Sequence, residues 1–271
     1  MTFLTANGVR TYYEVMGAGP PLLLIAGNGM DHTAYRDQLP SFAPHFRCIT
    51  YDLRGIGKSD VPESGYTVPD LARDALSLLD GLGVAAAHVA GYSLGGAVGL
   101  VMAIAAPERV RSLSLYSTFS HVEPYLRRRY ELLVKILLET TPELWAMFTA
   151  FTAFGEAYIN AHDADVEKEI ALRTARWAKA DAPSKIGLVG HYRAILAHDV
   201  RARLSEIRCP TWIAVGSSDP VAPPSYARYL NAHIAGSRLS IYPDAPHRLL
   251  NFTPQFTADA LAFLLEARGA H

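Results

Sequence analysis

The chain has 271 residues, of which 50% are hydrophobic and 19% charged, and its formal net charge is −1. This length and composition are typical of a globular enzyme with a large core, and the near-zero net charge argues against nucleic acid or an anionic membrane as the main partner. We find no charged N-terminal region followed by an apolar run and no apolar segment of membrane-spanning length. The sequence therefore predicts a cytoplasmic protein without a signal peptide or a transmembrane helix.

The first half of the chain alternates strand and helix patterns. A β-rich alternating run at 8–15 predicts an early strand, and further strands are expected at 22–26, 46–51, 88–90 and 112–116. Helices are expected between them, at 33–42, 68–82 and 94–106. Repeated units of this kind predict an α/β fold with a mostly parallel sheet and helices on both faces.

The pattern changes after residue 120. No convincing strand is found from 121 to 200, where helices are expected at 125–138, 142–154, 163–179 and 183–197. Strands return at 211–215 and 238–242, with helices at 223–234 and 254–266. We therefore divide the chain into the first part of a core (1–120), a helical lid (121–200) and the second part of the core (201–271). The lid follows a strand end, at the edge where open α/β sheets bind ligands.

The strand at 88–90 runs into Gly91-Tyr92-Ser93-Leu94-Gly95, which matches the G-x-S-x-G pattern of a nucleophile elbow. A turn this tight favours glycine on both sides of the serine, because side chains there would clash. The helix that follows offers unpaired N–H groups to a developing anion, with the N–H of Leu94 as the first donor of an oxyanion hole. Alone, the pattern is weak, since a glycine-rich turn often contains an incidental serine.

Two later strands end in loops that carry suitable partners for this serine. Asp219 follows the strand at 211–215, and His247 follows the strand at 238–242. Each residue in isolation is as well explained by a turn carboxylate or a surface histidine. The order serine, aspartate, histidine, with all three just past strand ends, together predicts a catalytic triad.

Over nearly its full length the chain resembles the α/β-hydrolase superfamily. The resemblance is carried by Gly27-Asn28-Gly29, the loop at 52–60, the elbow, Cys209-Pro210-Thr211 and His247. The segment 246–251 and the lid after Ser117-Thr118 make it most similar to 3-oxoadipate enol-lactonases and aminoacrylate-type hydrolases. The resemblance implies that Asn28 supplies the second oxyanion N–H. Many relatives have His-Gly where this chain has Ala26-Gly27, which removes a polar support of that loop.

Several further residues are assigned from the sequence. The substrate pocket is expected to include Gly27, Tyr92, Trp145, Phe148, Phe151 and Arg248. Asp52 and Arg54 are expected to brace the loop at the floor of the site. Glu123 is interpreted as a surface charge of the lid. The run at 127–129 is interpreted as a solvated helix face, although one of its three arginines could reach a carboxylate substrate.

Neither a metal nor a disulfide is predicted. The acidic cluster near His162 lacks the central glycine and the spacing of a calcium loop, and His191 and His198 lack further ligands. Cys48 and Cys209, the only cysteines, are expected to be buried free thiols.

The sequence thus predicts a cofactor-free serine esterase or lactonase that acts on a small, largely apolar molecule through an acyl-enzyme. One alternative is a carbon–carbon bond hydrolase of a ring-cleavage pathway with the same triad, which commonly has tryptophan where this chain has Arg248. Another is a non-catalytic ligand receptor on the same fold. The serine at position 93 disfavours dehalogenases and epoxide hydrolases, which use aspartate there. The expected partner is a small-molecule substrate, without nucleic acid or membrane, and a homodimer is left open.

Overall fold

The computed structural model describes residues 2–179, 182–252 and 254–269. Within these ranges the strands form one sheet in the order β1-β2-β4-β3-β5-β6-β7-β8. Their bounds are β1 (Thr2–Ala6), β2 (Val9–Met16), β3 (Pro21–Ile25), β4 (Arg47–Tyr51), β5 (Ala87–Tyr92), β6 (Val110–Tyr116), β7 (Thr211–Gly216) and β8 (Arg238–Tyr242). β1 and β2 are antiparallel to their neighbours, and the strands from β4 to β8 are parallel. The mostly parallel sheet predicted from the sequence is confirmed.

Helices cover both faces of this sheet. They are α1 (Leu39–Phe42), α2 (Val68–Gly81), α3 (Leu94–Ala105), α7 (Pro224–His233) and α8 (Pro254–Gly269), with 3₁₀ turns at His32–Tyr35, Pro107–Arg109, Arg201–Glu206 and Leu249–Asn251. Along β3, Leu23 and Ile25 belong to the core shared with α2 and α3, whereas Leu22 and Leu24 belong to the core shared with α8. Because successive side chains of a strand point to opposite faces, each central strand supplies both cores.

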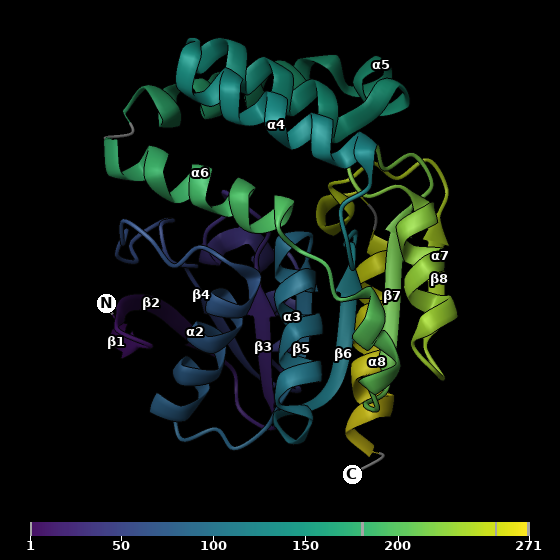
Figure 1. The fold of residues 1–271 in the computed structure, drawn as a ribbon. Helices are drawn as coiled ribbons and strands as arrows, with labels where there is room; N and C mark the ends of the chain where they lie inside the picture. The colour runs from purple at the N-terminus through teal and green to yellow at the C-terminus, as the bar shows by residue number, and fades with distance from the viewer. Residues whose placement is uncertain (1, 180–181, 253, 270–271) are drawn as a thin grey trace.

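In the described part of the chain, the helices between β6 and β7 are α4 (Pro124–Glu139), α5 (Pro142–Ala178) and α6 (Ala182–Leu196), where four helices were expected. They lie together above the carboxyl edge of the sheet (Figure 1). α5 is not one regular helix, because Gly155 (φ 72°) and His162 (φ −137°) have non-helical backbone angles. The helical stretches on either side of these residues match the two helices expected at 142–154 and 163–179.

The prediction of a single helix at 33–42 is wrong. The chain forms a 3₁₀ turn at His32–Tyr35 and then the one-turn helix α1, in which Pro40 occupies the first turn. A continuous helix would place Pro40 in its interior, where the proline ring clashes with the carbonyl four residues earlier and a hydrogen bond is lost. In the first turn the missing N–H costs nothing.

The two cysteines are free thiols, but only one of them is buried as expected. Cys48 lies inside β4, and burial raises the pKa of its thiol to about 12. Cys209 is only partly buried, because it precedes β7 and does not lie within it. None of the helices in the described ranges combines the length and apolarity that crossing a membrane requires.

Two histidines near the end of α6 are buried. The Nε2–H of His191 donates to the backbone oxygen of Arg54 at 2.9 Å, and the ring of His198 packs against Phe119. Burial lowers the pKa of each imidazole from its ordinary value of 6.5 to about 4. Between these two values the unfolded chain binds protons that the folded chain does not, so stability present above pH 6.5 is lost as the pH falls toward 4.

We therefore expect the free energy of unfolding to fall by about 2 kcal/mol per buried histidine between pH 7 and pH 5. The variant His191→Gln keeps an N–H donor at the position of Nε2 but does not titrate. Its loss of stability over the same interval should be smaller by about this amount, as measured by urea unfolding at both pH values. The same pH dependence in variant and wild type would show that His191 carries no such linkage.

Candidate active site

Ser93 lies at the sharp turn between β5 and α3. Its backbone has φ 54° and ψ −117°, a conformation that side-chain-bearing residues rarely adopt and that costs on the order of 1–3 kcal/mol. The turn is held on both sides of the serine: the N–H of Ser93 donates to the carbonyl of Tyr116 at 2.8 Å, and the hydroxyl of Thr118 donates to the Ser93 carbonyl at 2.6 Å. The structure thus has the tight strand-to-helix turn that the sequence predicted.

The two glycines of the elbow are required by close backbone contacts. A Cβ atom on Gly91 would lie 2.2 Å from the carbonyl oxygen of Gly95, and a Cβ atom on Gly95 would lie 2.2 Å from the carbonyl oxygen of Ile25. Both distances are far below van der Waals contact, and both neighbouring atoms are backbone. Any larger residue at these positions would have to displace the strand or the helix that positions Ser93.

Ser93, His247 and Asp219 form a continuous hydrogen-bonded series. Nε2 of His247 lies 3.2 Å from Oγ of Ser93, and Nδ1 lies 2.8 and 3.0 Å from the two carboxylate oxygens of Asp219. With the proton on Nδ1, the imidazole donates to the carboxylate and accepts from the serine hydroxyl. All three residues are buried, and Ser93 exposes only 1% of its surface. The residues that the sequence singled out separately are therefore within hydrogen-bond reach of one another.

Further contacts fix the aspartate and the histidine. Oδ1 of Asp219 accepts hydrogen bonds from the backbone N–H groups of Val221 and Ala222, each at 2.8 Å. The hydroxyl of Tyr92 donates to the carbonyl of His247 at 3.0 Å, and the N–H of His247 donates to the carbonyl of Ala153 in α5 at 3.1 Å. The backbone of His247 is thus hydrogen-bonded to the elbow on one side and to α5 on the other.

The two backbone groups expected to form an oxyanion hole lie at the same end of the sheet. Leu94 is the first residue of α3, so its N–H has no acceptor within the helix. Asn28 lies in the loop after β3 and lines the same cavity as Ser93. Its side-chain oxygen is 3.5 Å from the hydroxyl of Tyr130, a contact from α4. The assignment of Leu94 and Asn28 as oxyanion donors stays a prediction.

A cavity of about 620 Å³ adjoins Ser93 and His247. Four of the six residues expected to line a pocket do line it, namely Gly27, Tyr92, Trp145 and Arg248. Phe148 and Phe151 do not: Phe148 packs against the main core, and Phe151 is 70% exposed. The cavity face of α5 is instead the row Trp145, Thr149 and Ala153, spaced four residues apart. Apolarity alone could not separate this row from the outer face.

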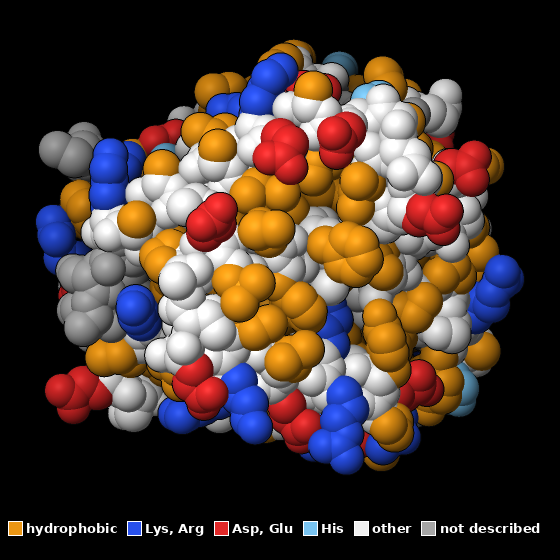
Figure 2. All heavy atoms as spheres, turned by 90° about the horizontal axis from the view of Figure 1, so that it is seen from above, with side chains coloured by type: hydrophobic (Ala, Val, Ile, Leu, Met, Phe, Trp, Pro, Cys, Tyr) orange, Lys and Arg blue, Asp and Glu red, His pale blue; other side chains and the backbone are white. Residues whose placement is uncertain are grey.

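The outer face of the inserted helices carries exposed hydrophobic side chains, and Figure 2 shows this face from above. They include Tyr125, Leu132, Leu138, Leu144, Met147, Phe151 and Leu172. The apolar residues of α5 are thus divided between this surface, the core and the cavity. Of the three α5 aromatic residues expected in the pocket, Trp145 lines the cavity, where it stacks on Trp177, another lining residue.

The cavity is lined by more charged side chains than the sequence indicated. Its cations are Arg36 after the 3₁₀ turn at His32–Tyr35, Arg129 from α4, Arg173 and Arg176 from α5, Lys179 after α5, and Arg248 beside His247; its carboxylates are Asp31 and Glu169. Of these, Arg248 was expected in the pocket, and Arg129 belongs to the run at 127–129, one arginine of which was considered able to reach a carboxylate substrate. Arg127 and Arg128 are exposed, as a solvated helix face requires, and Arg129 is the arginine of that run that reaches the cavity.

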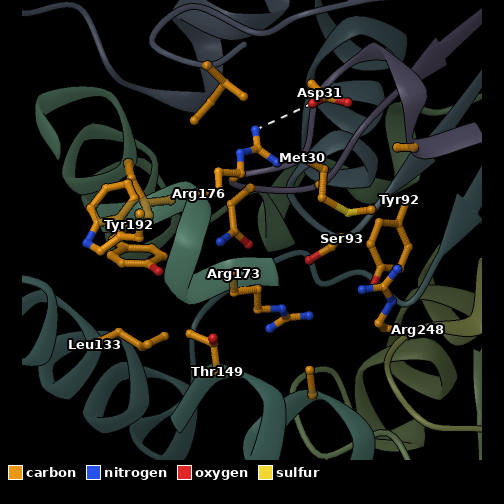
Figure 3. A pocket seen from close by; sticks show the side chains of 18 of the residues that line it. Met30, Asp31, Tyr92, Ser93, Leu133, Thr149, Arg173, Arg176, Tyr192 and Arg248 are labelled. Carbon is orange, nitrogen blue, oxygen red and sulfur yellow. Dashed lines mark ion pairs between the residues drawn. The ribbon is translucent and has the colours of Figure 1, made fainter. Parts of the chain in front are cut away.

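Several of these charges form two ion-paired groups, of which Figure 3 shows the pair of Arg176 and Asp31. Arg176 pairs with Asp31 at 3.4 Å, and its side chain is 58% exposed. Deeper in the cavity, Oε1 of Glu169 accepts from both Nε of Arg173 at 2.9 Å and Nη1 of Arg248 at 2.6 Å. Although burial opposes the effect, these two guanidinium groups lower the pKa of Glu169. The carboxylate of Glu169 is therefore shared by the guanidinium groups of Arg173 and Arg248.

The loop at 52–60 is braced as expected. Arg54 makes a two-point ion pair with the carboxylate of Asp74, at 2.6 Å from Nε and 2.5 Å from Nη2. Asp52 is buried and accepts from the backbone N–H of Lys58 at 2.8 Å. Glycines of this loop line the cavity. Within the described ranges, no group of three or more His, Cys, Asp or Glu side chains is placed to hold a metal ion.

Comparisons with known proteins agree with this fold. The family described as alpha/beta hydrolase fold matches residues 20–250. The chain is 33% identical, over 94% of both sequences, to the "Putative carbamate hydrolase RutD" of Azorhizobium caulinodans. Among solved structures it is similar to a hydrolase from Pseudomonas aeruginosa (TM-score 0.85, 33% identity, 97% of each chain). It is also similar to the enol-lactonase of Burkholderia xenovorans (TM-score 0.86, 26% identity, covering 97% of this chain and 100% of that one).

Proposed function

The chain belongs to the α/β-hydrolase family, and we propose that it is a serine hydrolase that cleaves a small ester or lactone through an acyl-enzyme. The observation that carries the proposal is the hydrogen-bonded series of Ser93, His247 and Asp219 at the wall of a cavity. A serine hydroxyl is a weak nucleophile until a neighbouring base accepts its proton, and this series supplies the base and the group that orients it.

In the proposed reaction, Nε2 of His247 accepts the proton of the Ser93 hydroxyl as Oγ attacks the substrate carbonyl. The developing oxyanion accepts hydrogen bonds from the backbone N–H groups of Leu94 and Asn28. The imidazolium, stabilised by Asp219, then donates its proton to the leaving oxygen, and the acyl-enzyme remains. A water molecule repeats these steps: it gives its proton to His247, attacks the acyl carbon, and releases the acid and the Ser93 hydroxyl.

A carbamate is a second candidate substrate, because a relative of this chain bears the name of a carbamate hydrolase. A carbamate presents the same kind of acyl carbonyl, so the same residues would act in the same order. A carbon–carbon bond hydrolase would also use this triad. A panel containing an ester, a lactone, a carbamate and a ring-cleavage dienoate separates these candidates by the relative values of kcat/KM.

A fluorophosphonate probe tests the proposal directly, since it reacts with a serine only when a base activates it. We expect labelling of the wild type at Ser93, identified by peptide mass spectrometry, and loss of labelling in His247→Gln. The control His233→Gln changes an exposed histidine whose Nδ1 contacts the carbonyl of Tyr229, and it should label like the wild type. A folded wild-type protein that is not labelled would favour the receptor alternative.

A further inference from the structure

We propose that the substrate carries a carboxylate group apart from the bond that is cleaved, and that Arg173, assisted by Arg129, binds this group. The inference rests on the proposed function, because it names the class of substrate for the same cavity. It changes the expectation of a largely apolar substrate to that of a small acid with an ester or lactone bond elsewhere in the molecule.

Arg173 presents an unused hydrogen-bonding edge to the cavity. Its side chain extends from α5 toward the side on which Tyr92 and Arg248 lie (Figure 3) and is only 20% exposed. Its Nε donates to Glu169, and no described residue accepts from its two Nη groups. Two parallel N–H donors of one guanidinium group match the two oxygens of a carboxylate. The free edge of Arg173 is therefore shaped for such a ligand.

The positive charge around Arg173 is only partly neutralised. Glu169 is shared with Arg248, through the same oxygen atom. Burial, together with the nearby charge of Arg248, lowers the pKa of Arg173. A buried cation without a full counter-charge is costly, and an anionic ligand relieves this cost. The surplus charge at this place therefore favours an anion over a neutral group of the same size.

Arg129 adds a second cation from the opposite helix. Its Nη2 donates to the hydroxyl of Thr152 at 2.7 Å, and its buried Nε has no partner among the described residues. Arg129 and Arg173 both act electrostatically on the hydroxyl of Tyr192, which lines the same cavity. Arg176 differs from both, because it is paired with Asp31 and largely exposed. The anion site is thus assigned to Arg173 and Arg129.

The test compares two esters that differ by one charge. Mono-p-nitrophenyl adipate has a free carboxylate, and p-nitrophenyl methyl adipate has the same chain with that carboxylate capped. We expect the wild type to prefer the acid by about tenfold or more in kcat/KM. Arg173→Met should lower kcat/KM for the acid by roughly 30- to 100-fold and change that for the capped ester by less than about threefold.

Two further variants separate recognition from structure. Arg173→Lys keeps a charge but loses the two-point donor edge, so it should retain an intermediate preference for the acid. Lys168→Met removes one positive charge from the exposed surface of the same helix and should leave both esters unaffected. Arg173→Met is expected to fold, because Glu169 keeps its partner Arg248; if it does not fold, Arg173→Lys decides.

A binding measurement keeps this inference independent of turnover. Calorimetry should show that the Ser93→Ala protein binds adipate. The double variant Ser93→Ala/Arg173→Met should not bind it. Equal hydrolysis of the two esters by the wild type, or an equal loss on both in Arg173→Met, would overturn the assignment. Adipate binding without fluorophosphonate labelling would instead reject the proposed function and leave the anion site standing.

Discussion

Ser93→Ala should abolish ester hydrolysis, with kcat lower by roughly 10⁵- to 10⁶-fold. The residual rate would come from substrate binding and oxyanion stabilisation alone, because among the described residues Nε2 of His247 is hydrogen-bonded to the hydroxyl of Ser93 and to no other nucleophile. The substitution removes one oxygen atom and keeps the Cβ, so it introduces no new clash at the elbow. His247 keeps its contacts with Asp219, Tyr92 and Ala153, so the site should remain assembled.

The measurement is single-turnover and steady-state hydrolysis of a p-nitrophenyl ester, with urea unfolding to show that stability is retained. Ser64→Ala, at an exposed loop position, is the matched control and should behave as the wild type. Turnover by Ser93→Ala above about 1% of the wild-type rate, in protein free of wild-type contamination, would mean that Ser93 is not the nucleophile.

The parts of the site that could be predicted from sequence are those fixed by local rules. Ser93 is recognisable by the glycines on either side of it. Close backbone contacts leave no room for a side chain at these two positions. Asp219 and His247 follow the parallel strands β7 and β8, and parallel strands bring their carboxyl ends to one edge. Topology thus converts a sequence order into a spatial cluster without any knowledge of side-chain packing.

The cationic lining could not be predicted, because it depends on how α5 lies over the sheet. Glu169, Arg173 and Arg176 are spaced as neighbours on one helix face, a pattern that usually marks a solvent-exposed surface. Here that face is turned toward the cavity. The same cause explains Phe151, whose apolar side chain is exposed on the outside. Helix orientation is a tertiary property, so the sequence did not indicate the charged lining and wrongly placed Phe151 in the pocket.

His247 and the proposed anion site are connected by a series of hydrogen bonds and ion pairs. His247 donates its N–H to the carbonyl of Ala153 in α5, and the next residue, Arg248, pairs with Glu169 farther along α5. Glu169 in turn holds Nε of Arg173. A ligand that attracts Arg173 therefore acts on the loop that carries His247, the proposed base. Substrate charge is expected to influence kcat as well as KM for this reason.

Asp219→Asn should lower kcat by about 10⁴-fold while leaving the fold intact. The asparagine oxygen can still accept from Val221 and Ala222, which hold Oδ1 in place. Its NH₂ group would then face Nδ1 of His247 and donate to it. This fixes the imidazole proton on Nε2, the atom that must accept the proton of Ser93. The base is thus present in the correct position but in the wrong tautomer, and the loss appears in kcat more than in KM.

The control for this variant is Glu123→Gln, which removes the other carboxylate that the sequence placed near the end of a core strand. Glu123 is about half exposed, and its carboxylate lies 3.6 Å from His121, so its removal should leave kcat unchanged. If Asp219→Asn kept activity within about tenfold of the wild type while Glu123→Gln lost it, the orienting acid would be Glu123. The two-point contact of Asp219 with Nδ1, at 2.8 and 3.0 Å, argues for the opposite result. A carboxylate this close, buried and held by two backbone N–H groups, is already arranged to stabilise the imidazolium that forms when Ser93 attacks.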